Sequence, residues 1–295
     1  MALTPVPSSL LHSANSSLNL SQDDFLYHFG ISRSTVDMVK VFGDTKFVCC
    51  GGSPTRFEHY AKEFSKEHGL ELSENLSRSD RFVIYKTGPV LWINHGMGAP
   101  SLSIMLVETL KLVLYSKATD VTFIRLGTSG GVGVAPGSVV ITSAPLNGEL
   151  KEEHVQFIAG KKVAREARLD KRLQADLYAL GEDMGLPVVS GKTLCADDFY
   201  EGQMRLDGYF CDYTADDKFK FLRSLHDSGV RNIEMESTCF CSFTSRAGIK
   251  AAIVCVTLLN RMDGDQVTLT KNEYLDFETR PFKLVSAYIK QQLRL

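Results

Sequence analysis

The chain has 295 residues, of which 44% are hydrophobic and 23% are charged. These fractions are close to those of globular domains, so they exclude collagen-like, low-complexity and largely disordered proteins. The 33 lysines and arginines nearly balance the 35 aspartates and glutamates, which leaves a formal net charge of −2. Because no basic excess exists to attract a phosphate backbone, we expect no nucleic-acid partner.

The seven cysteines form no CxxC pair and show no spacing typical of a zinc site. Most lie in apolar segments, which indicates small buried side chains in a reducing compartment, so we expect a cytoplasmic protein without a disulfide framework. Residues 1–22 are polar and lack both the charged and the apolar region of a signal peptide. We interpret them as a disordered arm, and we expect no membrane span because no uninterrupted apolar run is long enough.

From residue 23 onward, short apolar runs alternate with stretches of helical periodicity. Strands are predicted at Phe47–Cys50, Val90–Ile93, Val121–Leu126, Gly137–Ala144, Val188–Cys195 and Ala251–Val256. Helices are predicted at Pro54–His68, Ser101–Tyr115, Asp170–Met184, Asp216–Asp227 and Glu236–Ala247. Continuous apolar strands are covered on both faces, so the pattern predicts an α/β fold. We expect one domain over residues 23–295, a three-layer sandwich whose large mixed, mostly parallel sheet is flanked by helices.

In folds of this kind, ligands bind beyond the carboxyl ends of the strands. The segment Gly51–Arg56 follows a predicted strand and precedes a helix that Pro54 is suited to begin. Its backbone N–H groups and Arg56 suit a phosphate-sized anion, and a tight turn with a solvated arginine is the alternative. The segment Arg125–Gly133 is predicted as a second glycine loop at a strand–helix junction, and it places another arginine near the end of an apolar strand, where the arginine needs an anion or a carboxylate. One bound phosphate explains both segments together.

Two further polar clusters follow later in the chain. Phe199–Arg205 contains Gln203 and Arg205, whose side chains point the same way if the segment is extended. An amide beside a guanidinium suits a planar imide, although any polar loop can contain such a pair. Asn232–Thr238 begins a long apolar helix. Its Glu236 either interacts favourably with the helix dipole or accepts hydrogen bonds from two vicinal hydroxyls of a sugar.

Taken in order, these four clusters resemble the uridine phosphorylases of the nucleoside phosphorylase superfamily. The most specific matches are Asp198–Gly208, Arg231–Ser237 and Val256–Arg261. The resemblance extends from about Phe25 to the C-terminus and implies a single α/β domain of the nucleoside phosphorylase type. It also implies the reversible reaction of uridine with phosphate, which yields uracil and ribose 1-phosphate. Inorganic phosphate is then a co-substrate, and no cofactor is expected.

The same resemblance implies a role for each candidate residue. Phosphate would be bound by Gly52, Arg56, Arg125 and Thr128, with Arg81 contributed by a neighbouring subunit. Uracil would be bound by Gln203 and Arg205, with Phe199 against the ring and Arg261 bracing the pair. Ribose would be bound by Met235 and Glu236, with His28 contributed by the neighbouring subunit. The catalytic residues would be Arg56, Arg125 and Arg205, in a molecule that is at least a homodimer with shared active sites.

Three departures from related sequences refine this expectation. Phe82 follows Arg81, where bacterial members have an acidic residue of a potassium site, so no metal site is expected. Purine-specific relatives have an aspartate where this chain has Asn260, which favours a pyrimidine base. Inactive relatives replace the base-reading glutamine by an apolar residue, whereas Gln203 is retained. The alternatives are a purine nucleoside phosphorylase or a nucleosidase on the same fold, and a catalytically silent nucleoside-binding homologue.

Overall fold

The computed structural model describes Asn15, Leu18 and residues 23–295, which form two compact units. The first unit comprises the described residues up to Gly96 together with Pro100–Ile124 and Phe243–Lys250. The second comprises Met97–Ala99, Arg125–Ser242 and Ala251–Leu295. The arm expected at residues 1–22 lies outside the described residues, apart from Asn15 and Leu18. The single domain over residues 23–295 stays a prediction.

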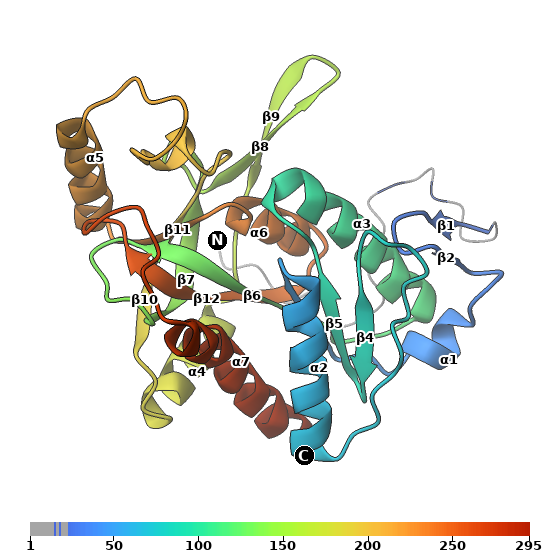
Figure 1. The fold of residues 1–295 in the computed structure, drawn as a ribbon. Helices are drawn as coiled ribbons and strands as arrows, with labels where there is room; N and C mark the ends of the chain where they lie inside the picture. Colours follow the sequence, from blue (N-terminus) through green and yellow to red (C-terminus); the bar gives the residue numbers. More distant parts are fainter. Residues whose placement is uncertain (1–14, 16–17, 19–22) are drawn as a thin grey trace. The chain divides into compact units, whose positions relative to one another are not determined.

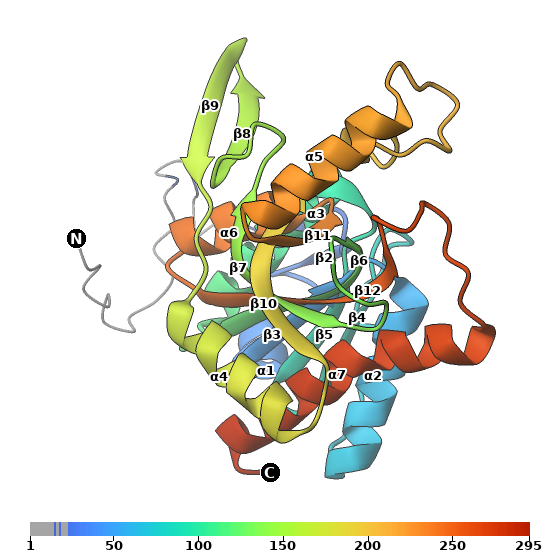
Figure 2. The same ribbon diagram turned by 90° about the vertical axis from the view of Figure 1, so that its left-hand side faces the viewer.

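Three strands of the first unit lie side by side in the order β3 (Phe47–Gly51), β5 (Val90–Asn94) and β4 (Ile84–Thr87) (Figures 1 and 2). β3 and β5 are parallel, and β4 is antiparallel to β5. Every residue of β3 and β5 is buried, as their continuous apolar runs predict. A short hairpin of β1 (Phe25–Leu26) and β2 (Ile31–Ser32), followed by helix α1 (Met38–Phe42), precedes these strands.

Helix α2 (Pro54–His68) packs on strands β4 and β5 and has the predicted bounds (Figure 1). Ser53 caps its first turn by accepting a hydrogen bond from the backbone N–H of Arg56 at 3.3 Å. Gly69 ends the helix with a φ of 63°, in the left-handed region that glycine adopts without strain. The buried face packs on Trp92 and repeats every three or four residues, as Phe57, Tyr60, Ala61 and Phe64.

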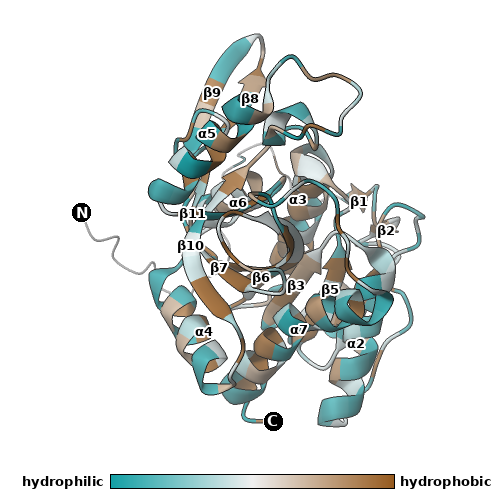
Figure 3. Ribbon diagram, turned by 60° about the vertical axis from the view of Figure 1, so that its left-hand side comes forward, coloured by the Kyte–Doolittle hydropathy of each residue, from teal (hydrophilic) through white to brown (hydrophobic). Residues whose placement is uncertain are grey.

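The second unit contains five strands, apart from the first three residues of β6 and the first residue of β12, which belong to the first unit. They are β6 (Thr122–Gly131), β7 (Val139–Leu146), β10 (Val188–Cys195), β11 (Val230–Glu234) and β12 (Lys250–Asn260). Their order is β11-β10-β7-β12-β6, and β11 pairs in addition with β6, so that the five strands close into a ring (Figure 3). β10 is parallel to β7 and β11, whereas β12 is antiparallel to β7. The predicted mixed sheet is confirmed.

Helices cover the strands of the second unit. α4 (Lys171–Asp183) contacts β7 and β10 and lies beside α7 (Lys271–Leu293) (Figures 1 and 2). α5 (Ala215–Asp227) packs on β11 through an apolar cluster that includes Leu222, Leu225 and Ile233. α6 (Ser237–Arg246) follows β11, and the hairpin of β8 (Glu153–Ile158) and β9 (Lys161–Glu166) extends away from the ring (Figure 2). The α/β class with helices flanking the sheet is confirmed.

Two segments differ from the sequence prediction. Arg125–Gly133 is not a loop between a strand and a helix, because Gly130 and Gly131 pair with β11 and β6 continues to Gly131 before strand β7 follows. Val230–Glu234 is a strand rather than the start of a helix, and α6 begins at Ser237. In both places pairing with distant strands overrides the local glycine and acidic signals.

Helix α3 (Gly98–Ser116) is, within the part of the chain that the structure describes, the one helix long and apolar enough to cross a membrane by length and composition. Half of its apolar window is buried in the protein. The helix also carries Glu108 and Lys111, which pair with His28 and Asp24. We therefore interpret α3 as a helix with one face in the core of the first unit.

All seven cysteines are free thiols, six of them buried and Cys211 exposed. Burial raises the pKa of Cys255 to about 12, which makes its thiol unreactive. Among Asn15, Leu18 and residues 23–295, no group of three or more His, Cys, Asp or Glu side chains is placed to hold a metal ion.

Candidate functional site

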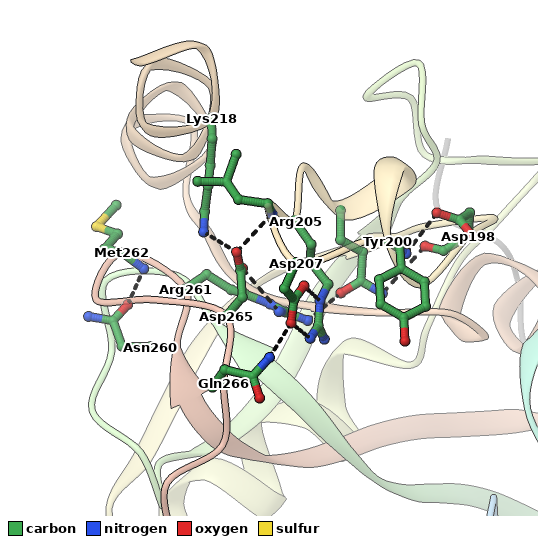
Figure 4. A network of polar contacts seen from close by, with 12 residues as sticks. Asp198, Tyr200, Arg205, Asp207, Lys218, Asn260, Arg261, Met262, Asp265 and Gln266 are labelled. Carbon is green, nitrogen blue, oxygen red and sulfur yellow. Dashed lines mark hydrogen bonds and ion pairs between the residues drawn. The ribbon is translucent and has the colours of Figure 1, made fainter. Parts of the chain in front are cut away.

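Three of the residues predicted to bind the base, Gln203, Arg205 and Arg261, gather in the second unit; Figure 4 shows the two arginines close to each other. Gln203 ends a single 3-10 turn that begins at Glu201, and Met204 follows with a φ of 54°. The segment is therefore not extended, so the condition under which Gln203 and Arg205 were expected to point the same way is not met. Arg261 contacts Gln203 directly and lies close enough to Arg205 for the two charges to interact.

Arg261 holds the amide of Gln203 in one orientation. It follows β12 directly, and its backbone N–H donates to the carbonyl of Gly131 at 2.8 Å. Its Nη2 donates to Gln203 Oε1 at 2.6 Å, and each of the two residues is 2% exposed. Because a guanidinium can only donate, this contact identifies the amide oxygen and directs the amide NH₂ elsewhere. Burial, and then the proximity of Arg205, lower the pKa of Arg261.

Arg205 is both ion-paired and stacked. Its Nε and Nη2 donate to the two carboxylate oxygens of Asp207 at 2.7 and 2.5 Å. This pair raises the pKa of Arg205 and lowers that of Asp207. The ring of Phe199 lies 4.4 Å from the guanidinium carbon, and the ring of Tyr200 lies 5.2 Å from it. The guanidinium of Arg205 is thus held between a carboxylate and two aromatic rings, and its Nη1 takes no part in the bidentate ion pair.

Arg125, on β6, is buried against two carboxylates. Its Nη1 lies 3.0 Å from Glu234 Oε2 and 3.2 Å from the sulfur of Cys255, and its Nη2 contacts Glu236. The sequence analysis expected either an anion or a carboxylate beside this arginine, and the structure shows carboxylates. Glu234 also accepts the backbone N–H groups of Glu236 at 3.0 Å and Ser237 at 2.9 Å, which joins β11 to α6. Burial raises the pKa of Glu234.

The predicted ribose residues lie at this junction. Glu236 is 6% exposed, and its Oε1 accepts a hydrogen bond from the backbone N–H of Gly98 at 2.6 Å. Its carboxylate thus has one oxygen on Arg125 and one on a main-chain donor. Met235 precedes it and is half-buried. Thr128, predicted to bind phosphate, is half-buried on β6 three residues after Arg125.

The other predicted phosphate residues belong to the first unit. Gly52 lies just before α2, and a Cβ placed on it would lie 3.0 Å from the carbonyl oxygen of Gly96, so the position suits glycine. Arg56 is half-buried in the first turn of α2, where the helix N-terminus attracts anions. Arg81 is exposed beside Asp80, with N and O atoms 3.8 Å apart. Whether these residues surround one phosphate with Arg125 and Thr128 stays a prediction.

His28 is held by a buried carboxylate of α3. Its Nδ1 lies 2.7 Å from Glu108 Oε1. The backbone N–H groups of His28 and Phe29 also donate to Glu108 at 3.0 Å. The carboxylate therefore fixes both the main chain and one ring nitrogen, which leaves Nε2 as the nitrogen that faces away from Glu108.

A family model described as "Phosphorylase superfamily" matches residues 46–290. The chain belongs to the phosphorylase superfamily. It is 64% identical over 269 residues to a Caenorhabditis elegans protein named "Uridine and thymidine phosphorylase", with 91% of each chain covered. It is 45% identical over 286 residues to mouse "Uridine phosphorylase 1", with 95% of this chain and 92% of the relative covered.

The fold of this superfamily member also matches solved structures. The structure of uridine phosphorylase from Schistosoma mansoni in complex with uracil is 42% identical and aligns with a TM-score of 0.88. The alignment covers 92% of this chain and 95% of that one. The resemblance to uridine phosphorylases and the nucleoside phosphorylase fold, both predicted from motifs and element order, are confirmed.

Four carboxylates that bind predicted site residues of this superfamily member were not themselves predicted as site residues. They are Glu108, Asp207, Glu234 and Asp265. Asp207 lies two residues after Arg205 inside a motif that carries the resemblance, so its position was a usable signal. Glu234 also lies inside such a motif, but its partner Arg125 belongs to another strand. Asp265 stands four residues after Arg261, so sequence spacing could have suggested that pair. Nothing local to Glu108 points to His28, because the two segments pack together only in the folded chain.

The substitution Gly130→Ala tests the placement of Arg261 without changing a charge. A Cβ at Gly130 would lie 2.5 Å from Arg261 Nε, and Arg261 is too buried to move aside freely. We expect the KM for a pyrimidine nucleoside to rise roughly tenfold, with a smaller change in kcat. Steady-state kinetics measures both values, and Gly148→Ala is the control because its added Cβ would contact nothing within 4 Å. An unchanged KM for Gly130→Ala would contradict the role of Arg261.

Proposed function

We propose that this chain catalyses the reversible phosphorolysis of uridine to uracil and ribose 1-phosphate. The observation that carries the proposal is the buried contact between Arg261 and Gln203 beside Arg205. Since Arg261 identifies the amide oxygen, Gln203 can accept the imide N–H of uracil and donate its NH₂ to a neighbouring carbonyl. Arg205 then donates to a second carbonyl, and cytosine is rejected because its donor and acceptor pattern differs.

The reaction needs only the stabilisation of charge. A phosphate oxygen bonds to the anomeric carbon as the bond from that carbon to uracil N1 breaks. The electron pair of the broken bond passes to N1 and spreads to the carbonyl oxygens of the base. Arg205 stabilises this negative charge, while phosphate held by Arg56 and Arg125 faces the oxocarbenium-like sugar. Met235 and Glu236 position the ribose. No metal ion or organic cofactor takes part, so activity survives removal of metals by a chelator.

A nucleoside panel tests the proposal. With phosphate present we expect uridine to be cleaved, and we expect inosine to remain intact. Without phosphate we expect uridine to remain intact, because three arginines are assigned to phosphate and none to an attacking water. Cleavage of inosine would favour a purine nucleoside phosphorylase, and cleavage without phosphate a nucleosidase. Binding of uracil without turnover would identify a silent homologue. Thymidine and deoxyuridine in the same panel determine whether the 2′-hydroxyl and a 5-methyl group affect the rate.

We propose further that the protein is a cytoplasmic homo-oligomer, at least a dimer, with His28 and Arg81 reaching the active site of the neighbouring subunit. Support comes from the first unit, where the exposed side of α3 presents Ile104 and Val107, and where Tyr27, next to His28, is 70% exposed. An apolar surface of this kind is typical of a subunit interface. Seven free thiols agree with a reducing compartment.

Mixing two inactive variants tests the shared site. Arg81→Ala and Arg205→Ala chains should each have little activity as homodimers. If Arg81 acts across the interface, each mixed dimer has one intact site, so an equal mixture should recover about a quarter of wild-type activity. Native mass spectrometry of the mixture verifies that subunits have exchanged. No recovery in exchanged dimers would place Arg81 outside the partner's active site.

A further inference from the structure

Lys218 is a buried lysine that none of the assignments above uses. It lies in α5, is 1% exposed, and its Nζ is 2.8 Å from Asp265 Oδ2 (Figure 4). Lysine is almost never fully buried unless it is paired. Replacing a buried ion pair by apolar residues is often neutral or stabilising, so stability alone does not account for this pair.

Asp265 connects Lys218 to the base site. Its Oδ2 also accepts the backbone N–H of Leu206 at 2.9 Å, directly after Arg205 in the chain. Its Oδ1 lies 3.5 Å from Arg261 Nη1. One carboxylate therefore joins α5, the segment that carries Arg205, and the segment that follows β12. Any change in its charge or position is transmitted to the groups that contact the base.

The charges of this network do not cancel. The cations are Arg205, Arg261 and Lys218, and the anions are Asp207 and Asp265, so the sum is 3 − 2 = +1. Without Lys218 the sum is zero. Uncompensated charge has a strong effect in a site shielded from water, because the local dielectric constant is low.

We propose that Lys218 is a positioning residue for cleavage of the base: through Asp265 it leaves the base site with one excess positive charge, which stabilises uracil as it departs as an anion. The inference rests on the proposed phosphorolysis of uridine. It assigns Lys218 no contact with the substrate. Its effect is exerted through Arg205 and Arg261, whose positive charge would otherwise be cancelled by the two carboxylates.

Leaving-group dependence separates this role from a structural one. Fluorine at position 5 withdraws electrons, so the base of 5-fluorouridine leaves as a more stable anion. Its cleavage therefore depends less on stabilisation of the negative charge by the protein. In Lys218→Met we expect the single-turnover cleavage rate to fall about 30-fold for uridine but only about threefold for 5-fluorouridine. Lys218→Arg, which retains the charge, should recover most of the rate for uridine. Lys220→Met, an exposed lysine of the same helix, is the matched control and should change neither rate.

A double variant tests the charge itself. Lys218→Met combined with Asp265→Asn restores the sum to 2 − 1 = +1, so the ratio of the two rates should return towards that of the wild type. Equal losses for both nucleosides in Lys218→Met, or a double variant no better than the single one, would overturn the proposal. The controls keep the two hypotheses separate. If the wild type and Lys220→Met cleave neither nucleoside, the proposed function fails. If both cleave uridine normally, an unselective Lys218→Met overturns the role of Lys218 alone.

Discussion

Arg205→Ala is expected to lower the kcat for uridine about a thousandfold while the protein stays folded. Removing one donor that stabilises developing negative charge typically costs a factor of about 100 to 1,000. Here the loss should reach the upper end of that range, because the carboxylate of Asp207 then stays beside the departing base without its guanidinium partner. The absorbance change on conversion of uridine to uracil, at saturating phosphate, measures the effect.

A second variant separates the loss of the Arg205 donor from the effect of the unpaired Asp207 carboxylate. Arg205→Ala combined with Asp207→Asn removes the stranded carboxylate, so it should be about tenfold faster than Arg205→Ala alone. Arg223→Ala, an exposed arginine of α5, is the control for a general loss of positive charge. Circular dichroism checks the fold of each variant. If Arg205→Ala retains turnover within about tenfold of the wild type, Arg205 is not the group that stabilises the leaving base.

The sequence predicted those parts of the fold that depend on local signals. Helix α2 has its cap, its proline and its terminal glycine within one continuous segment, and its bounds were predicted to the residue. Strand β10 likewise has its predicted bounds. In contrast, Val230–Glu234 is a strand only because β10 and β6 lie on either side of it. A polar segment of five residues carries no such information by itself.

The site divides in the same way. Gln203, Arg205 and Arg261 could be named as candidates because they stand in specific motifs, whereas the contacts that tie the candidate residues to distant elements could not be predicted. Asp265 reaches Lys218 across 47 positions of sequence, and Glu108 reaches His28 across 80. Charged residues are common on exposed helix faces, so neither pattern marks burial. Only packing shows that these carboxylates hold the candidate residues, so the sequence indicated candidates for binding the base better than the residues that position those candidates.

Arg125→Ala is expected to lower both activity and stability, in contrast to Arg205→Ala. Arg125 is the cation beside the carboxylates of Glu234 and Glu236, all three of which are nearly inaccessible to solvent. Removing one partner of a buried ion pair typically costs about 3–5 kcal/mol, because a charge then stays buried without its partner. We expect the melting temperature to fall by roughly 5–10 °C and phosphorolysis to fall at least about a hundredfold. Arg172→Ala is the control: the side chain of Arg172 is 93% exposed, so this change should affect neither quantity.

The dependence of this stability loss on pH identifies the cause. Burial raises the pKa of Glu234 above its ordinary value, and Arg125 opposes that rise. A carboxyl group whose pKa is raised by folding stabilises the folded state when protonated, and this contribution is lost as the pH rises through the folded-state pKa. Without Arg125 that pKa rises further, so the difference in melting temperature between wild type and Arg125→Ala should shrink as the pH falls from about 8 to about 5.5. Adding Glu234→Gln to Arg125→Ala removes one of the two buried carboxylates and should weaken this dependence, the remainder belonging to Glu236. A stability loss that is constant over this range would show that Arg125 acts by packing and not by neutralising Glu234.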